Sequence, residues 1–325
     1  FYISYINLFN IIYFIEKHFK GDITLKKIFY YMLTVFLIMF YCSFGILISS
    51  KPFNSYSVKK NIEYLSSDTL KGRLPGTEEN ILAANFIKDN FIKNGLNPLN
   101  NNYYNNFTAY YPKKLDKKPY LKVLDGNNVV VKEYSYYKNY KEDLLNFRNN
   151  KCVFNKNSKL YCSNDFILAN CKNGSFLFYT PKDNNLNFRS SFFPSSKFDM
   201  YVMITSETKK ELIKFLNKGY CIECFIPYEV KDTVLSNVCA VIPGKSNSSP
   251  VVISGHFDHL GVDLSNTIYP GALDNASGIC FVMELSKYIK SLGTPDRDII
   301  FVGFNGEEFG DRKSTRLNSS HPGYL

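Results

Sequence analysis

Two strand-like segments and one helix-like segment follow one another near the end of the chain. Val251–Ser254 and Asp298–Phe304 are short continuous apolar runs, the pattern of strands that are buried on both faces. Between them, apolar residues recur at helical spacing from Asn275 to Ile289. Strand, helix, strand implies a right-handed crossover, so we expect an α/β fold with a mostly parallel, mixed sheet and helices on both faces.

Two further helices are predicted nearer the N-terminus. The first is Ser57–Leu65, and a turn-rich loop, Lys71–Gly76, leads to the second. Thr77 is suited to cap that second helix, and Gly95 to end it. We assign residues 56–106 to the first part of the same domain.

The pattern changes between residues 107 and 235. Short strands rich in Tyr and Val alternate there with turns rich in Asn, and Lys209–Lys218 has a helical pattern. We interpret residues 107–235 as an inserted, β-rich domain, and residues 236–310 as the second part of the domain that it interrupts.

An uncharged run from Ile28 to Ile48 follows two lysines. About 20 apolar residues cross a bilayer, and a positive flank is also the plan of a secretory signal. We expect residues 25–50 to be a single-pass membrane anchor or, alternatively, a cleaved signal. Either would place most of the chain outside the cytoplasm, membrane-anchored or secreted.

The two ends of the sequence differ from the rest. Translation starting at Leu25, from a bacterial TTG codon, would make residues 1–24 non-native read-through. Residues 311–325 are polar and aperiodic and resemble translated sequencing-adapter tails. We expect neither segment to belong to the native protein.

Composition excludes some classes of protein. The 325 residues are 45% hydrophobic, too apolar for a disordered chain. The 39 basic residues exceed the 29 acidic ones, but they form no basic stripe, so we expect no nucleic-acid partner. Only four residues are histidines, which makes their positions informative.

Polar side chains stand where the predicted strands end. His256 and Asp258 follow the first strand, Asp274 lies at the entrance to the helix, and Glu307 and Glu308 follow the second strand. Imidazole and carboxylate groups are ligands of zinc. Because ligands bind at the carboxyl ends of strands in such sheets, the sequence predicts a metal site there.

The spacing supports separate roles for these side chains. His256 and Asp258 are two apart in extended chain, so the carboxylate can orient the imidazole. Adjacent Glu307 and Glu308 point in different directions, so one can bind metal while the other accepts a proton from water. Each motif alone has an ordinary structural explanation, and the role of His259 stays open, but three motifs in order at strand ends are specific.

With these motifs, residues 56–310 resemble the bacterial di-zinc aminopeptidases of the twenty-eighth metallopeptidase family. The resemblance is strongest from Ser236 to Gly310. The loop Lys71–Gly76 is similar to the segment before that family's insert, and residues 200–230 are similar to the end of a protease-associated domain.

The resemblance implies a role for each candidate residue. His256 would bind one zinc ion, with Asp258 orienting it, and Asp274 would bridge two zinc ions and precede a cis peptide bond. Glu307 would be the general base, and Glu308 would bind the second zinc. The implied enzyme binds two Zn²⁺ and hydrolyses N-terminal residues from peptides through a water activated between them.

The sequence departs from the family pattern after Gly310. The family has a further carboxylate ligand and a distal His beyond the Glu-Glu motif, whereas Asp311 comes too early and His321 lies in the doubtful tail. We therefore expect the chain to be C-terminally truncated and inactive as written, and the complete gene product to be an aminopeptidase.

Two other functions stay open. One is a non-catalytic binding protein on the same scaffold, and the other is a single-zinc transferase similar to glutaminyl cyclases. The cysteines do not distinguish between these functions. Cys221 and Cys224 form a single C-x-x-C pair, and both disulfides and unpaired thiols are compatible with the insert.

Overall fold

The computed structural model describes residues 30–32, 34–35, 53–191 and 196–309, and the chain divides into two compact units at Pro52. No helix among these residues is long and apolar enough to cross a membrane. The predicted read-through, most of the predicted anchor and the predicted tail lie outside the described residues. The second unit begins at Phe53 and contains all the candidate site residues.

Two of the predicted helices open this unit. Helix α3 spans Ser55–Leu65 and α4 spans Glu78–Lys93, with the short helix η1, Asp68–Arg73, between them. The Thr77 side chain accepts a hydrogen bond from the backbone of Asn80 and so caps α4, as predicted. The first N–H groups of a helix have no partner within the helix, and a polar side chain accepts a hydrogen bond from them at the start of both helices, Asn54 for α3 and Thr77 for α4.

The sheet beside these helices is mixed. Its order is β1 (Asn97–Pro98), β12 (Tyr228–Ile242), β16 (Ile299–Phe304) and β13 (Val251–His256), with β2 (Tyr104–Lys114) also paired to β12. Only β13 and β16 run parallel. The prediction of a mostly parallel sheet is therefore wrong for the described residues, because β12 returns from the insert antiparallel to β16.

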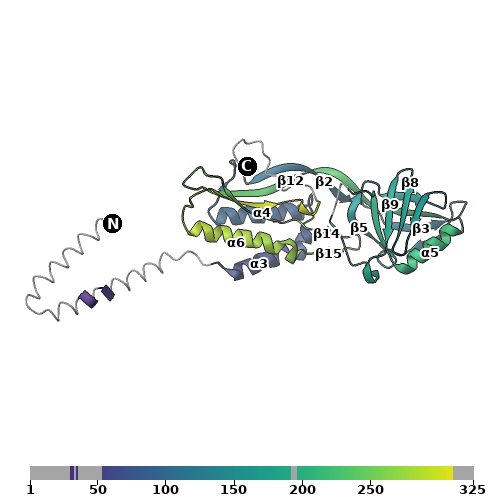
Figure 1. Ribbon diagram of the computed structural model, residues 1–325, viewed down its shortest axis with the longest axis horizontal. Helices are drawn as coiled ribbons and strands as arrows, with labels where there is room; N and C mark the ends of the chain where they lie inside the picture. The colour runs from purple at the N-terminus through teal and green to yellow at the C-terminus, as the bar shows by residue number, and fades with distance from the viewer. Residues whose placement is uncertain (1–29, 33, 36–52, 192–195, 310–325) are drawn as a thin grey trace, which may run out of the picture. The chain divides into compact units, whose positions relative to one another are not determined.

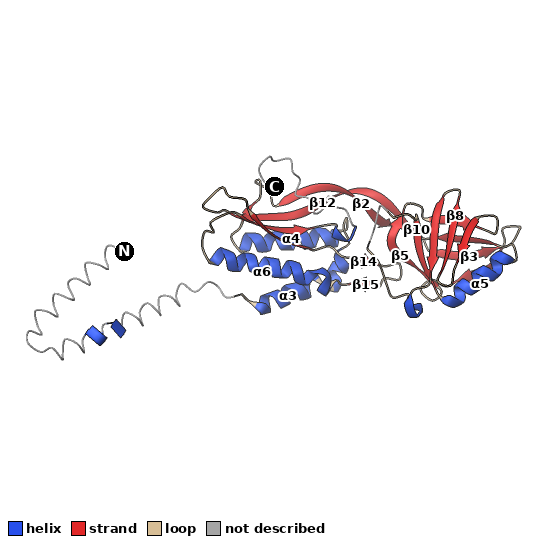
Figure 2. Ribbon diagram, viewed as in Figure 1, coloured by secondary structure: helices blue, strands red, loops and turns tan. Residues whose placement is uncertain are grey.

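Helices α3, α4 and α6 (Ser277–Ser291) lie on one face of this sheet, as Figure 2 shows. Ile87, Ile279 and Phe301 belong to the core that joins helices and sheet. On the opposite face, Ile300 and Val302 form a smaller cluster without a described helix. Helices on both faces were predicted, and this is wrong for the described part of the chain.

Strands β3 to β11 and helix α5 form the β-rich insert (Figure 1). One sheet has the order β5-β10-β9-β8-β7 and another the order β4-β3-β11-β6. The elements are β3 Tyr120–Leu124, β4 Val130–Tyr134, β5 Tyr140–Phe147, β6 Lys151–Phe154, β7 Lys159–Cys162, β8 Phe166–Cys171, β9 Gly174–Tyr179, η2 Lys182–Asn184, β10 Met200–Ile204, α5 Ser206–Asn217 and β11 Cys221–Phe225. Strands β2 and β12 pair along their length, from Tyr104 opposite Val238 to Lys114 opposite Tyr228, and so run through the predicted boundaries at residues 107 and 235.

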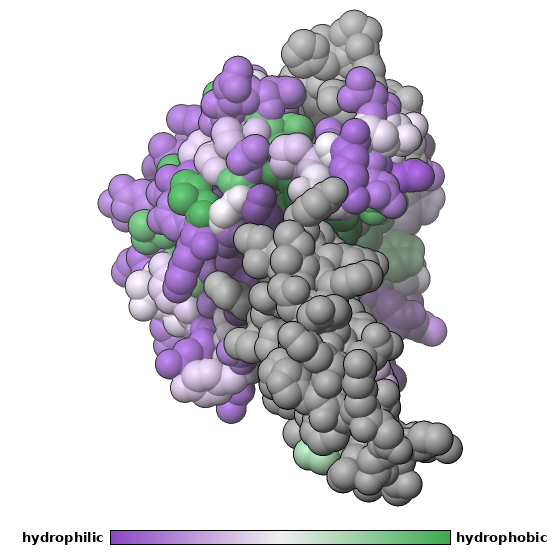
Figure 3. Space-filling view, turned by 90° about the vertical axis from the view of Figure 1, so that its left-hand side faces the viewer, coloured by the Kyte–Doolittle hydropathy of each residue, from purple (hydrophilic) through white to green (hydrophobic). Residues whose placement is uncertain are grey.

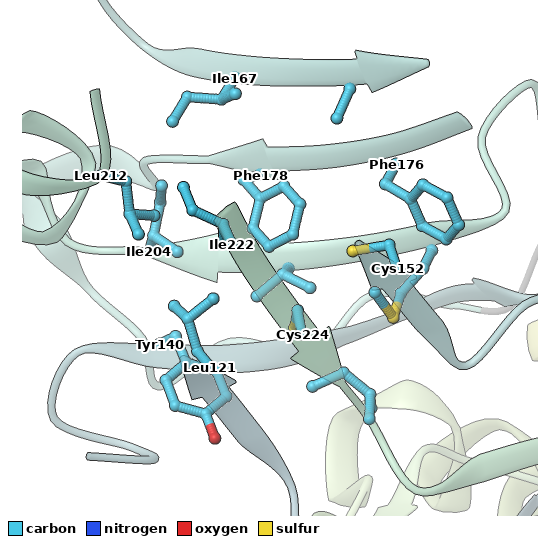
Figure 4. Close-up of a cluster of buried hydrophobic side chains, with 14 of the residues drawn as sticks. Leu121, Tyr140, Cys152, Ile167, Phe176, Phe178, Ile204, Leu212, Ile222 and Cys224 are labelled. Carbon is cyan, nitrogen blue, oxygen red and sulfur yellow. The ribbon is translucent and has the colours of Figure 1, made fainter. Parts of the chain in front are cut away.

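The insert has its own hydrophobic core. Figure 4 shows Phe176, Phe178 and Ile222 among the side chains that meet between its sheets, all of them fully buried. Cys152 and Cys224 lie directly opposite each other on β6 and β11, and every cysteine in the described residues is a free thiol. Apolar side chains thus fill the interior of the insert. Figure 3 shows the end of the molecule away from the insert, where hydrophilic residues predominate on the described surface.

Candidate metal centre

The predicted site residues meet at the carboxyl ends of β13 and β16. These strands run parallel, with His256 opposite Phe304, so the segments that follow them leave the sheet at the same edge. Asp258 is fully buried there and accepts hydrogen bonds from the backbone N–H groups of Glu307 (3.2 Å) and Glu308 (3.1 Å). One carboxylate therefore ties the loop after β13 to the loop after β16.

Asp274 reaches the same place from the turn before α6. This turn, Ala272–Ala276, contains a cis peptide bond between Asp274 and Asn275, as the resemblance implies. The Asp274 side chain is 69% exposed, and its Oδ1 lies 3.1 Å from Nε2 of His256.

The two adjacent glutamates occupy different environments. Glu307 is half exposed, and its Oε2 lies 3.9 Å from Nε2 of His256. The Glu308 side chain is only 5% exposed, and one of its oxygens lies within 4.8 Å of ligand atoms of both His256 and Asp274. We call His256, Asp258, Asp274, Glu307 and Glu308 the metal centre.

Carboxylates dominate the electrostatics of the metal centre. Burial disfavours the charged imidazole, but the carboxylates of Asp258, Glu307 and Asp274 outweigh it and raise the pKa of His256 to about 9. Burial and the neighbouring carboxylates likewise raise the pKa of Glu307. For Glu308, burial is outweighed by its side-chain hydrogen-bond partners, which lower its pKa.

The donors fit a divalent cation. One imidazole and two carboxylates converge within 4.8 Å, which is the ligand chemistry of zinc. The second imidazole nitrogen, Nδ1 of His256, is buried without a hydrogen-bond partner among the described residues and lies 3.7 Å from Asp258. Asp258 is therefore on the side of the ring from which a carboxylate orients a ligand histidine.

Arg73 supports the metal centre, and we did not predict this role. It is fully buried and donates hydrogen bonds to the carbonyl groups of Phe257 (2.6 Å), Pro270 (2.8 Å) and Gly271 (3.0 Å). Burial lowers the pKa of Arg73 to about 10. The guanidinium thus fixes the backbone beside both Asp258 and Asp274. The Lys71–Gly76 motif was the only sequence signal for it.

Gly72 allows Arg73 to reach this position. A Cβ atom on Gly72 would lie 2.2 Å from the carbonyl oxygen of Tyr269, and the residue has a φ of +68°. Only glycine permits both this approach and this backbone conformation without strain.

Two other side chains contact Glu308. Nδ1 of His259, whose role the sequence left open, lies 2.9 Å from Oε1 of Glu308. Ser191, which belongs to the insert, donates a hydrogen bond to Oε2 of Glu308. No sequence signal pointed to Ser191, because 117 residues separate it from its partner.

The segment that contains the metal centre matches a known family. Residues 237–323 match the model of Peptidase family M28. A probable zinc metalloprotease of Pyricularia oryzae is 39% identical over 79 residues, which are 23% of this chain and 16% of that protein. Another, of Pyrenophora tritici-repentis, is 38% identical over 95 residues, 28% of this chain and 19% of that protein. The matches thus span less than a fifth of either curated relative, and both relatives are fungal rather than bacterial.

Two aminopeptidases are among the solved structures that this chain matches. The aminopeptidase from Aneurinibacillus sp. strain AM-1 gives a TM-score of 0.47 at 16% identity, over 80% of this chain and 65% of that chain. A zinc aminopeptidase from Bacillus subtilis gives a TM-score of 0.43 at 15% identity, over 80% and 64%.

The family match extends to residue 323 and so includes part of the segment predicted to be an artefactual tail; the origin of that tail stays a prediction. The metal centre lies in the segment that matches Peptidase family M28, and the chain also matches two proteins named as probable zinc metalloproteases.

Proposed function

We propose that this chain carries the catalytic centre of a zinc metalloaminopeptidase that binds two zinc ions. The observation that carries the proposal is the convergence of His256, Asp274 and Glu308 within 4.8 Å, with Glu307 beside them, in the segment that matches Peptidase family M28. A binding protein without catalysis would gain nothing from holding these carboxylates together at a cost in repulsion.

The environments of the side chains suit distinct roles. His256, Asp274 and Glu308 would hold the metal, and Asp274, the most exposed of them, would be the ligand shared by two zinc ions. Asp258 orients His256 and fixes the backbone of Glu307 and Glu308. Bound zinc supplies a Lewis acid for the peptide carbonyl and lowers the pKa of water.

Glu307 is the proton acceptor in this proposal. It is half exposed, so solvent and substrate can reach it, and its raised pKa brings it closer to the value at which a carboxylate both accepts and returns a proton. The substrates proposed are peptide or protein N-termini, as the resemblance to aminopeptidases implies.

Zinc binding is the first test of the proposal. Titration of Zn²⁺ alone, followed by calorimetry and by metal analysis after gel filtration, should show zinc retained by the wild-type chain and lost in Asp274→Ala. Asp296→Ala is a matched control, because Asp296 is also an exposed aspartate in a loop but lies at the opposite end of β16 from the metal centre. Equal zinc binding by Asp274→Ala and wild type would refute the proposed site.

Substrate class is the second test. The native gene product, assayed with aminoacyl nitroanilides, should release the nitroaniline and should contain two zinc ions per chain. One zinc ion with cyclisation of N-terminal glutamine would instead indicate a transferase similar to glutaminyl cyclases. Zinc binding without turnover of either substrate would indicate a binding protein.

We also propose an extracytoplasmic location, which rests on the uncharged run from Ile28 to Ile48 that follows Lys26 and Lys27. Fractionation of cells that express the native gene should place the protein in the membrane or the medium. Recovery in the cytosol would contradict this.

A further inference from the structure

Glu308 is held from two directions by parts of the chain that are distant in sequence. Its Oε1 lies 2.9 Å from Nδ1 of His259, and its Oε2 accepts a hydrogen bond from Oγ of Ser191. The first partner belongs to the loop after β13, whereas the second belongs to the insert. Because Glu308 is 5% exposed, these partners rather than water determine where its carboxylate points.

The insert fixes the residue next to Ser191. Both oxygens of the buried Asp143 bind Ser190: Oδ1 accepts from its backbone N–H (2.7 Å) and Oδ2 from its hydroxyl (3.1 Å). Oδ2 also accepts from the hydroxyl of Tyr179 on β9 (2.6 Å). The backbone that leads into Ser191 is therefore anchored to two strands of the insert.

A buried arginine adds a second anchor. Arg189 is 3% exposed, and its guanidinium lies 5.7 Å from the ring centroid of Tyr228 and 5.9 Å from that of Tyr269. Its Nη2 donates to the hydroxyl of Tyr228 at 3.1 Å. Since Tyr228 begins β12 and Tyr269 ends β15 (Ile268–Tyr269), this segment packs against both the insert and the region of the metal centre.

The same side of the insert also holds the hairpin that precedes Asp274. This hairpin consists of β14 (Gly261–Val262) and β15 (Ile268–Tyr269). Lys141 Nζ lies 3.0 Å from Asp263 Oδ2, and the backbone N–H of Leu264 donates to Glu142 at 3.2 Å. Strand β5 therefore contacts the hairpin directly (Figure 1).

We propose that Ser191 is a positioning residue of the metal centre, through which the insert sets the orientation of Glu308 for zinc. A carboxylate oxygen has two lone pairs, so Glu308 can accept the Ser191 hydrogen bond and still bind metal. Hydrogen bonds to a metal ligand commonly change metal affinity by about 10- to 100-fold. This inference rests on the proposed function, and it makes the insert part of the zinc site.

The test compares two neighbouring serines. Ser191→Ala should weaken zinc binding by about 10- to 100-fold, measured by competition with a chelator of known affinity. Ser191→Thr keeps the hydroxyl and should bind zinc within about threefold of wild type. Ser190→Ala is the matched control: it removes a hydroxyl from the same segment, but that hydroxyl binds Asp143 instead of Glu308, so zinc affinity should stay within about threefold of wild type.

Thermal unfolding of the zinc-free variants separates positioning from folding. Ser191→Ala should lower zinc affinity without a larger loss of melting temperature than Ser190→Ala. The inference is overturned if Ser191→Ala binds zinc as tightly as wild type, or if Ser190→Ala weakens binding equally. If the wild type binds no zinc, or binds it without need of Asp274, the proposed function fails and this inference fails with it.

Discussion

The metal centre and the contact between β5 and the β14–β15 hairpin differ in how their charged side chains are balanced. At the contact, Lys141 and Asp263 are fully buried and lie 3.0 Å apart, so one charge neutralises the other. The metal centre instead gathers four carboxylates around His256 and raises its pKa. Buried charge persists in a fold only when it is paired or binds a metal. The first region is therefore complete within the chain, whereas the donors of the second fit a divalent cation.

The largest effect we predict concerns chemistry in the metal centre. Glu307→Gln should reduce turnover by the native gene product by about 10²- to 10⁴-fold, because the amide cannot accept a proton. Zinc affinity should change little, since Glu307 is not one of the three converging ligands. Glu133→Gln is a matched control, because Glu133 is 55% exposed where Glu307 is 50% exposed. Loss of zinc affinity in Glu307→Gln would mean that this residue is a ligand.

Substitutions in the ion pair of Lys141 and Asp263 should change the stability of the fold. Asp263→Ala leaves the Lys141 charge buried without its ion-pair partner, and we expect the free energy of unfolding to fall by about 3–5 kcal/mol, measured with urea. Replacing both residues, with Lys141→Met and Asp263→Leu, should cost much less because no charge is left buried. A double variant as unstable as the single one would contradict the view that charge pairing dominates this contact.

The same pair predicts how stability depends on pH. Burial alone would raise the pKa of Asp263, but side-chain hydrogen bonds from Ser265 and Lys141 lower it below its ordinary value of 3.8. A carboxylate with a lowered pKa in the folded state stabilises the fold above the unfolded value and loses that contribution as the pH falls through the folded value. Urea midpoints of wild type should therefore fall more steeply below pH 4 than those of the double variant.

Arg73 combines features of both regions. It is a buried charge, and it binds the backbone that carries residues of the metal centre. Arg73→Lys should lower the free energy of unfolding by about 2 kcal/mol, since one ammonium group cannot replace a guanidinium that spans several carbonyl groups. Arg297→Lys, at an exposed position, should change it by less than about 0.5 kcal/mol. Equal effects of the two changes would contradict the role assigned to Arg73.

The smallest predicted effect lies outside both charged regions. Thr77→Ala removes the N-cap of α4 and should cost about 1 kcal/mol, whereas Thr77→Ser should recover most of it. Neither variant should change zinc affinity. A change in zinc affinity would show that the start of α4 is coupled to the metal centre.

Local sequence patterns predicted the elements that hold the metal centre. Apolar runs and helical spacing identified β13, β16, α4 and α6, because burial on both faces or along one stripe leaves a direct record in the sequence. The arrangement of the sheet was not predictable in this way. The position of β12 between β16 and β2 depends on pairing between strands that are far apart in the chain.

The sequence by itself determined which residues gather: His256, Asp258, Asp274 and the two glutamates each follow a strand or precede a helix, and parallel strands bring their carboxyl ends to one edge. Only the tertiary structure decided what holds them in place. Arg73 reaches Gly271 across 198 residues, and Ser191 reaches Glu308 across 117. Such contacts satisfy buried polar groups after the chain has packed, and no periodicity or spacing in the sequence records them.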